Sequence, residues 1–209
     1  MCPPEQNYIM RRPDSVPSGY TQPVKISQPN WLLNLISLVF LVGATVVVVL
    51  VSSGIIARVA ADPLIILGYS TRQSGYLVVL LLAVSLATFE IHEQLHRLFA
   101  KGLGLEPIYY RLKGHVVVRE TWISRRELNL MTAAPIFMIQ LPALLILIIA
   151  SGTLGDIAEL AFIMNAGFIA KDATDIIFHF RLPEETQFWM SDLGEETVGY
   201  FSAMYQNSD

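Results

Sequence analysis

The amino-acid sequence predicts an α-helical integral membrane protein with about four transmembrane helices and a small β-hairpin between the second and third helices. Two observations on the whole chain favour this class. The 209 residues are 53% hydrophobic and 15% charged, whereas a soluble domain typically carries about 25% charged residues. The apolar residues also gather in four blocks, and about 20 apolar residues are enough to cross the hydrocarbon core of a bilayer.

The charge and the cysteine content exclude several other classes. The formal net charge is −4 and no basic tract stands out, so we expect no nucleic-acid partner. Cys2 is the single cysteine, so it cannot form an intrachain disulfide, and no group of cysteines can hold a metal ion. Any metal site in this chain must therefore be built from His, Asp and Glu side chains.

The first part of the chain predicts a tail followed by one spanning helix. Residues 1–29 are rich in proline and show no sustained apolar period, so we expect a mostly disordered cytoplasmic tail. The block 31–57 contains no charged residue and is long enough to span a bilayer, and Trp31 suits the membrane interface. Residues 58–75 are expected to form a loop, whose short apolar run 64–67 dips into the interface.

The second apolar block, from about residue 76 to 100, ends with the pattern His-Glu-x-x-His, which is formed by His92, Glu93 and His96. Two histidines four residues apart lie one turn apart on the same helical face, so both imidazoles can bind one metal ion. Zinc is often held by such nitrogens, and its catalytic sites combine three protein ligands with one water. The intervening glutamate lies on nearly the same face, where it can take a proton from that water.

The connection to the third helix predicts a hairpin, because β-prone runs at 107–112 and 115–120 flank a Lys-Gly turn. An exposed edge of this hairpin could hold an extended substrate by strand addition, although an amphipathic connector without this role fits the same pattern. The third apolar block, 128–152, predicts another spanning helix. Pro135 and Pro142 inside this block predict a kink or a local break.

The fourth block, from about residue 157 to 180, predicts a helix with a polar stripe. Four polar residues recur at i, i+7, i+10 and i+14, which places them on one face: Asn165, Asp172, Asp175 and His179. A polar stripe on a membrane helix is expected to face inward. Carboxylates at an interfacial helix end that reach out to water are the alternative explanation.

Positively charged residues predict the orientation. Lys and Arg are concentrated between the second and third helices, and none lies between the third and fourth. Because such an excess marks the cytoplasmic side, both ends of the chain should be cytoplasmic, including the soluble acidic tail expected for 184–209. The membrane domain then comprises 30–183. The His-Glu-x-x-His end of the second helix and the acidic end of the fourth helix meet at the same cytoplasmic face, which favours a shared site.

Three short stretches carry a resemblance to a known family: the His-Glu-x-x-His pattern, Thr132-Ala-Ala-Pro135-Ile, and Asn165-Ala-Gly near Lys171-Asp172. They resemble the zincin peptidases, small integral-membrane proteins similar to the site-2 protease class of intramembrane zinc metalloproteases, and the resemblance covers roughly 76–195. It implies a metalloprotease core at 76–183 in which Asp172 is the third zinc ligand. Lys171 stands where the family usually has glycine, and Asp175 remains the alternative ligand.

The main hypothesis is a zinc-dependent peptidase that cuts within or beside the membrane, with Glu93 as the general base. The metal ligands would be His92, His96 and Asp172. Asn165 could hydrogen-bond the substrate or the oxyanion, or it could pack between helices as a simple amide. Glu90 and His179 could orient ligands without binding the metal, although an interfacial charge explains Glu90 equally well. The expected partners are membrane lipids and a membrane-protein or peptide substrate.

Two other hypotheses belong to different functional classes. A catalytically silent membrane protein could bind a metal ion or a partner in the same cavity, and Lys171 favours this alternative. A small transporter or channel component could use the polar end of the fourth helix, with Asp172, Asp175 and His179, as a path for protons or cations. The transporter hypothesis leaves Glu93 between the two histidines without a role.

Overall fold

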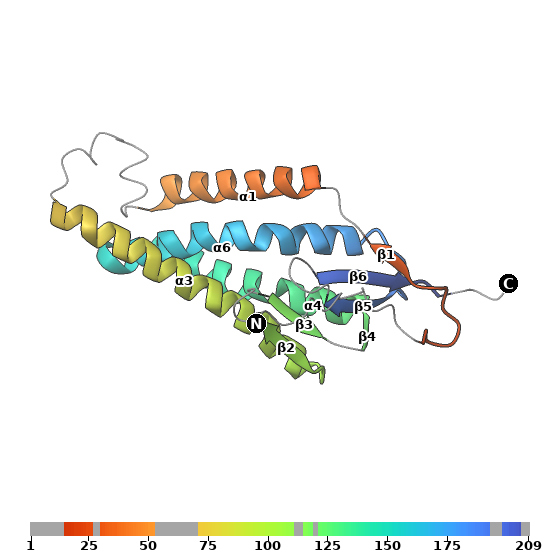
Figure 1. Ribbon diagram of the computed structural model, residues 1–209. Helices are drawn as coiled ribbons and strands as arrows, with labels where there is room; N and C mark the ends of the chain where they lie inside the picture. The colour runs from red at the N-terminus through yellow and green to blue at the C-terminus, as the bar shows by residue number, and fades with distance from the viewer. Residues whose placement is uncertain are drawn as a thin grey trace, which may run out of the picture.

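The computed structural model describes residues 15–26, 30–52, 71–110, 115–118, 121–192 and 198–205. Most of this part of the chain is helical, and four long helical segments run side by side (Figure 1). The segments are α1 (Asn30–Val51), α3 (Thr71–Gly102), a composite of α4 (Arg125–Pro135), η2 (Ile136–Gln140) and α5 (Leu141–Ile149), and α6 (Gly152–His179). The predicted set of four long helices is therefore confirmed.

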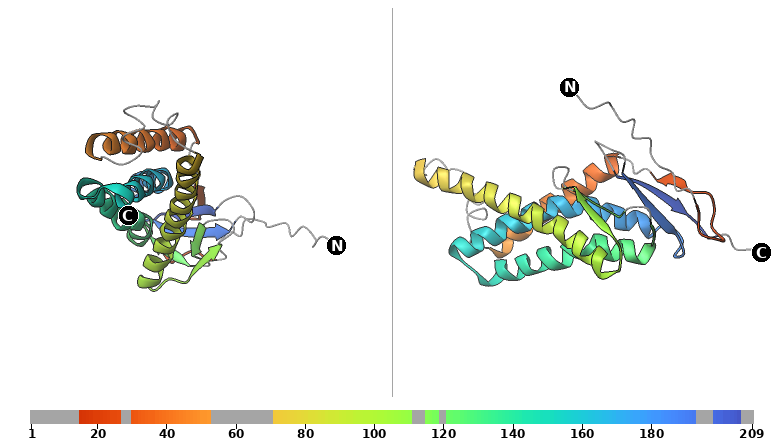
Figure 2. Two further views of the ribbon diagram at one scale, coloured as in Figure 1. Left: turned by 90° about the vertical axis from the view of Figure 1, so that its left-hand side faces the viewer. Right: turned by 60° about the horizontal axis from the view of Figure 1, so that its bottom comes forward.

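Each of the four segments is long and apolar enough to cross a membrane. In the most apolar stretch of α6, 61% of the residues are buried inside the protein, against 11% in α1. α6 is therefore the central helix, and it packs against α1, α3 and the composite segment (Figure 2). The other helices expose many Leu, Val and Ile side chains, which is the surface expected of helices that contact lipid.

The strands gather at one end of the helices (Figure 1). β1 (Val24–Ile26), β4 (Trp122–Ser124), β5 (Gln187–Asp192) and β6 (Val198–Ala203) form a sheet in the order β1-β6-β5-β4. All three neighbouring pairs are antiparallel. In the chain, β1 directly precedes α1, β4 directly precedes α4, and β5 follows α6. Because these strands belong to one sheet, the start of α1, the start of α4 and the end of α6 lie at the same end of the bundle.

Both ends of the chain contain strands that the sequence did not predict, and β1 corrects the disorder expected for residues 1–29 over the described stretch 24–26. The segment 1–29 contains β1, and Tyr20 also forms a bridge with Tyr205. The segment 184–209, expected to be a soluble acidic tail, contains β5 and β6. The physical reason is that each strand satisfies its backbone groups through a partner far away in sequence, which a local pattern does not reveal. Residues 1–14 and 206–209 lie outside the described residues.

The predicted β-hairpin is confirmed. β2 (Pro107–Tyr110) pairs with β3 (His115–Val118) in an antiparallel register, with Tyr110 opposite His115. The predicted Lys-Gly turn lies outside the described residues. α3 ends at Gly102, and Gly104 has φ 78°, the left-handed conformation that commonly stops a helix.

Two helices begin earlier than the apolar blocks predict. α3 starts at Thr71 and α6 at Gly152, so each helix includes several residues before its predicted apolar block. The end of the first predicted span, most of the predicted loop 58–75 and its apolar run 64–67 lie outside the described residues.

The break predicted in the third spanning segment takes the form of a π-helical turn. Pro135 has no N–H group to donate, and α4 ends at this residue. In the following turn the N–H of Leu141 donates to the carbonyl of Ile136, five residues earlier. Pro142 lies in the first turn of α5, where a missing N–H is tolerated. The wider turn changes the directions in which the side chains between the two prolines point.

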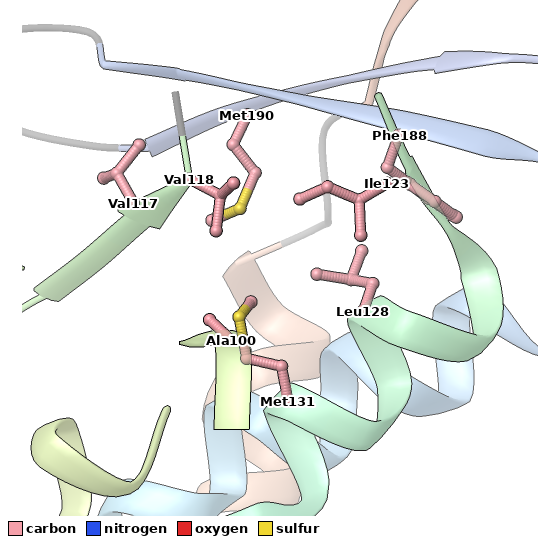
Figure 3. Close-up of a cluster of buried hydrophobic side chains, with 8 residues drawn as sticks. All are labelled: Ala100, Val117, Val118, Ile123, Leu128, Met131, Phe188 and Met190. Atoms are coloured by element: carbon pink, nitrogen blue, oxygen red, sulfur yellow. The ribbon is translucent and has the colours of Figure 1, made fainter. Parts of the chain in front are cut away.

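Eight buried hydrophobic side chains pack together between the strands and the helices (Figure 3). They come from α3, α4 and three strands: Ala100, Val117, Val118, Ile123, Leu128, Met131, Phe188 and Met190. Ile123 and Phe188 are fully buried where β4 pairs with β5. The hairpin, the sheet and the helix ends therefore share one hydrophobic core, which holds the strands over the end of the bundle.

Leu128→Ala should lower the free energy of unfolding by about 2–5 kcal/mol, because it empties a site in this core that is 1% exposed. Leu130→Ala should change it by less than about 1 kcal/mol, because that side chain on the same helix is 45% exposed. Denaturant unfolding of the detergent-purified variants measures the difference. Equal destabilisation by the two substitutions would contradict this assignment of the core.

Candidate metal centre

Three predicted ligands converge between α3 and α6. The Nε2 atoms of His92 and His96 are 3.1 Å apart. The Oδ2 atom of Asp172 lies 3.2 Å from the first and 3.4 Å from the second. These side chains form a group that could hold a metal ion, with His92 and Asp172 buried and His96 partly buried.

The distances in this group can be compared with those of a tetrahedral metal site. Zinc binds imidazole nitrogens and carboxylate oxygens at about 2.0–2.2 Å, so two ligands of a tetrahedron lie roughly 3.3–3.5 Å apart. The three separations of 3.1, 3.2 and 3.4 Å are within a few tenths of an ångström of this range. The three donor atoms could therefore serve as three ligands of a tetrahedral ion, with a water or a substrate oxygen as the fourth.

The second nitrogen of each imidazole contacts an acceptor. Nδ1 of His96 lies 2.9 Å from the carbonyl oxygen of Met131, and Nδ1 of His92 lies 3.0 Å from Oδ1 of Asn165. Because a carbonyl oxygen accepts but does not donate, each Nδ1 carries a hydrogen, and the neutral form of each ring presents its Nε2 lone pair. In that neutral form both histidines can bind a metal through Nε2.

The orientation of the Asn165 amide is itself fixed by two contacts. Its Nδ2 donates to Oε1 of Gln140 at 3.0 Å and approaches the carbonyl oxygen of Pro135 at 3.4 Å. With the NH₂ group used in this way, Oδ1 must face His92. Gln140 is the last residue of η2, so the π-helical turn places the acceptor that orients Asn165.

The carboxylate and the two imidazole lone pairs of this site would be stabilised by a bound cation. In these tautomers the two Nε2 lone pairs face the carboxylate oxygen of Asp172. That Oδ2 is buried and has no hydrogen-bond donor among the described residues. Lone pairs that face each other at such distances in a buried site repel, and a metal ion at their centre would remove the repulsion. The residues present therefore fit a divalent metal ion.

The three candidate ligands line a cavity of about 340 Å³. Glu93 is 9% exposed and lines this cavity together with the three candidate ligands. Three residues of the strands also line it, namely His115 and Val116 of β3 and Met190 of β5. The carboxylate that the sequence indicated as a base thus shares this cavity with the candidate ligands, and the strands form part of the cavity wall.

The alternative ligand, Asp175, is placed differently from Asp172. It lines the cavity, but its Oδ2 pairs with the ammonium of Lys171 at 3.1 Å. The metal group found among the described residues contains Asp172 and omits Asp175. The side chain of Lys171 is 60% exposed and lies at the border of the cavity. The geometry therefore favours Asp172 as the third ligand, with Lys171 beside the site.

The structure gives Asn165 a contact that differs from the predicted one. The residue is fully buried and is absent from the cavity lining. Its carbonyl oxygen accepts from His92, and its NH₂ group is directed toward the composite helix. This arrangement supports a role in orienting a ligand and leaves no polar atom of Asn165 directed toward a substrate.

Glu90 and His179 also contact residues other than the ligands. The carboxylate of Glu90 accepts from the hydroxyl of Tyr109 and from the side-chain amide of Gln94, each at 2.9 Å, and so connects α3 to β2. Nδ1 of His179 lies 2.8 Å from Oδ1 of Asn129, and its ring packs on Phe188 with centroids 4.7 Å apart. Both residues join helices to strands near the site.

Two residues of the site were not identified from the sequence. Gln140 could be recognised in the sequence as an amide within a long apolar block, but its hydrogen bond to Asn165 depends on the π-helical turn. His115 is one of four histidines in the chain, and its position over the cavity depends on how the hairpin packs. In each case tertiary packing, and not local pattern, brings the residue to the site.

Comparison with models of known protein families, with curated proteins and with solved structures gives no match to this chain. The geometry above is therefore the basis for any functional conclusion.

Asn165→Leu should lower the affinity for zinc by about 10–100-fold, because it removes the acceptor that fixes the His92 tautomer while preserving volume. Gln94→Leu is the matched control: it removes an amide one residue after Glu93 that bonds to Glu90 and does not line the cavity. Competition of each purified variant with a zinc-responsive dye measures the affinity. Unchanged affinity in Asn165→Leu would show that this amide does not orient the ligand.

Proposed function

We propose that this protein is a multi-pass membrane metallopeptidase that uses one zinc ion to hydrolyse peptide bonds within or beside the membrane. The observation that carries the proposal is the convergence of two Nε2 atoms and one carboxylate oxygen at 3.1–3.4 Å, with Glu93 lining the same cavity. A His-Glu-x-x-His helix with a third carboxylate ligand is a ligand set that suits catalytic zinc.

Membrane insertion is part of this proposal. Four long apolar helices with outward-facing aliphatic side chains support it, as does the burial of the polar stripe on the central helix α6. The Lys and Arg residues between the second and third spans favour a cytoplasmic location for the end that carries the strands. The site would then lie near the cytoplasmic face.

The chemistry divides between the metal ion and the protein. A bound zinc ion would supply a water with a pKa of about 7 and would polarise the scissile carbonyl. His92 and His96, held by Asn165 and the Met131 carbonyl, would keep the ligand geometry fixed. Glu93 would take the proton of the water and pass it to the leaving amine. The strands over the cavity would limit the entry of bulk water.

The substrate would lie along β3. This strand pairs with β2 on one edge and has no strand partner on the other edge among the described residues. Two of its residues, His115 and Val116, line the cavity that contains the metal group. A peptide added to that edge would be extended and would pass the candidate ligands, which suits hydrolysis because helical carbonyls are otherwise hydrogen-bonded.

The second candidate function is a catalytically silent protein that binds a metal ion or a partner in the same cavity. The ion pair between Lys171 and Asp175 at the border of the cavity favours it, because it places bulk and charge beside the approach to the metal group. The metal content and the turnover of the purified protein distinguish the two candidates.

The metal site can be tested by elemental analysis of the detergent-purified protein. The wild type should contain about one zinc per chain, and His92→Ala and Asp172→Ala should each lose most of it. Asp175→Ala should retain zinc, because this carboxylate pairs with Lys171 and lies outside the metal group. A wild-type protein that binds no metal even when zinc is supplied would overturn the proposal.

The general base can be tested separately. Glu93→Gln should keep its zinc but cleave test peptides and single-span substrates about 10²–10⁴-fold more slowly, because the amide cannot accept the proton of the water. Single-turnover cleavage in detergent or nanodiscs measures the rate. If the zinc-loaded Glu93→Gln variant cleaved at the wild-type rate, Glu93 would be excluded as the base. If the wild type and the variant both bound zinc and neither cleaved any substrate, the catalytically silent alternative would be favoured.

A further inference from the structure

The last two turns of α3 carry a second polar site, away from the metal group. Arg97 and Lys101 lie four residues apart, one turn above each other on the same helix. They border an open groove of about 740 Å³ between the end of α3 and the base of the hairpin. The groove shares no residue with the cavity of the metal group.

Arg97, one of the residues that line the groove, has an unfilled hydrogen-bonding requirement. The Nε of Arg97 is buried and has no hydrogen-bond partner among the described residues. A buried N–H without an acceptor is costly, and the cost is larger when the group is charged. Because a guanidinium donates through five N–H groups in a fixed plane, the ligand that suits it best is an oxyanion that accepts from two of them.

The charges and walls of the groove define the ligand further. Among the described lining residues, two cations and the carboxylate of Glu106 give a formal charge of +1, which suits an anion with a single negative charge. Its remaining wall is partly apolar, and the lining residues are Arg97, Lys101, Leu105, Glu106, Pro107, Ile108 and Thr121. A singly charged head attached to an apolar body fits this combination better than a small dianion does.

The groove also lies at a suitable depth. The candidate span Gly75–Gly102 has 28 residues, whereas about 20 helical residues cross the hydrocarbon core. If the span begins at Gly75, Arg97 lies about 4–5 Å and Lys101 about 10 Å beyond the core, at a rise of about 1.5 Å per residue. The headgroup layer extends about 5–7 Å beyond the core on each side, so Arg97 lies within this layer and Lys101 lies at its outer edge.

We infer that this groove binds the phosphodiester of an anionic phospholipid, with Arg97 as the main donor and Lys101 as the second cation. The lipid would stand beside the base of the hairpin, because Pro107 and Ile108 of β2 form part of its wall. This inference rests on the proposed membrane insertion, and it does not depend on peptidase activity.

The test is native mass spectrometry of the full-length protein, delipidated in mild detergent and titrated with phosphatidylglycerol or with phosphatidylcholine of the same acyl chains. The wild type should bind about one phosphatidylglycerol with at least a tenfold preference over phosphatidylcholine. Arg97→Gln should weaken phosphatidylglycerol binding at least tenfold, in line with the loss of a charge-assisted hydrogen bond. Arg126→Gln should bind as the wild type does, because Arg126 is an exposed residue at the same end of the bundle that does not line the groove.

The control variants separate this site from the metal centre. His92→Ala should lose zinc but retain the lipid, and Arg97→Gln should lose the lipid but retain zinc, which also shows that it is folded. Equal lipid binding by wild type and Arg97→Gln would overturn the inference. Displacement of the lipid by inorganic phosphate at similar concentrations would also overturn it, since the groove would then recognise a soluble anion.

Discussion

The contact on which the rest of this structure depends is the approach of Asp172 on α6 to His92 and His96 on α3. A carboxylate and two imidazoles at such distances inside a helical bundle are unfavourable unless their charges and lone pairs are compensated. The surrounding structure supplies part of this compensation. The hydrogen on each Nδ1 is directed to a fixed acceptor, and the three remaining donor atoms are left for one ion at their centre.

One of these two acceptors, Asn165, is held in place by an irregular helix. A regular α-helix through Pro135 would place the side chain of Gln140 on a different face. The π-helical turn directs it toward Asn165, so a defect in one helix sets the orientation of a ligand on another. π-helical turns within helices are frequently found at functional sites, and here the connection can be followed through two hydrogen bonds. The strands complete the site from outside the bundle, and their shared core with α3 and α4 keeps them in place.

Much of this arrangement could be predicted because its signals are local. Apolar blocks identify the four helices, alternating β-prone runs identify the hairpin, and the spacing of His92 and His96 places two ligands on one helical face. The four-stranded sheet could not be predicted, because β1 is a three-residue strand whose partner β6 lies near the other end of the chain. Asn165 was found on the polar stripe, but its contact with His92 depends on a turn in a different helix. The position of His115 depends in the same way on how the hairpin packs.

The pairing of β1 with β6 has a consequence for the order in which the molecule is made. The N-terminal strand has no strand partner among the described residues until the last strand has been synthesised. The helices that carry the three candidate ligands precede β5 in the chain, so these side chains can meet before β5, which supplies Met190 to the cavity lining, has been translated. At that stage the described lining of the cavity lacks only the part that Met190 supplies. The cavity is thus completed by the end of the chain, after the three candidate ligands have been made.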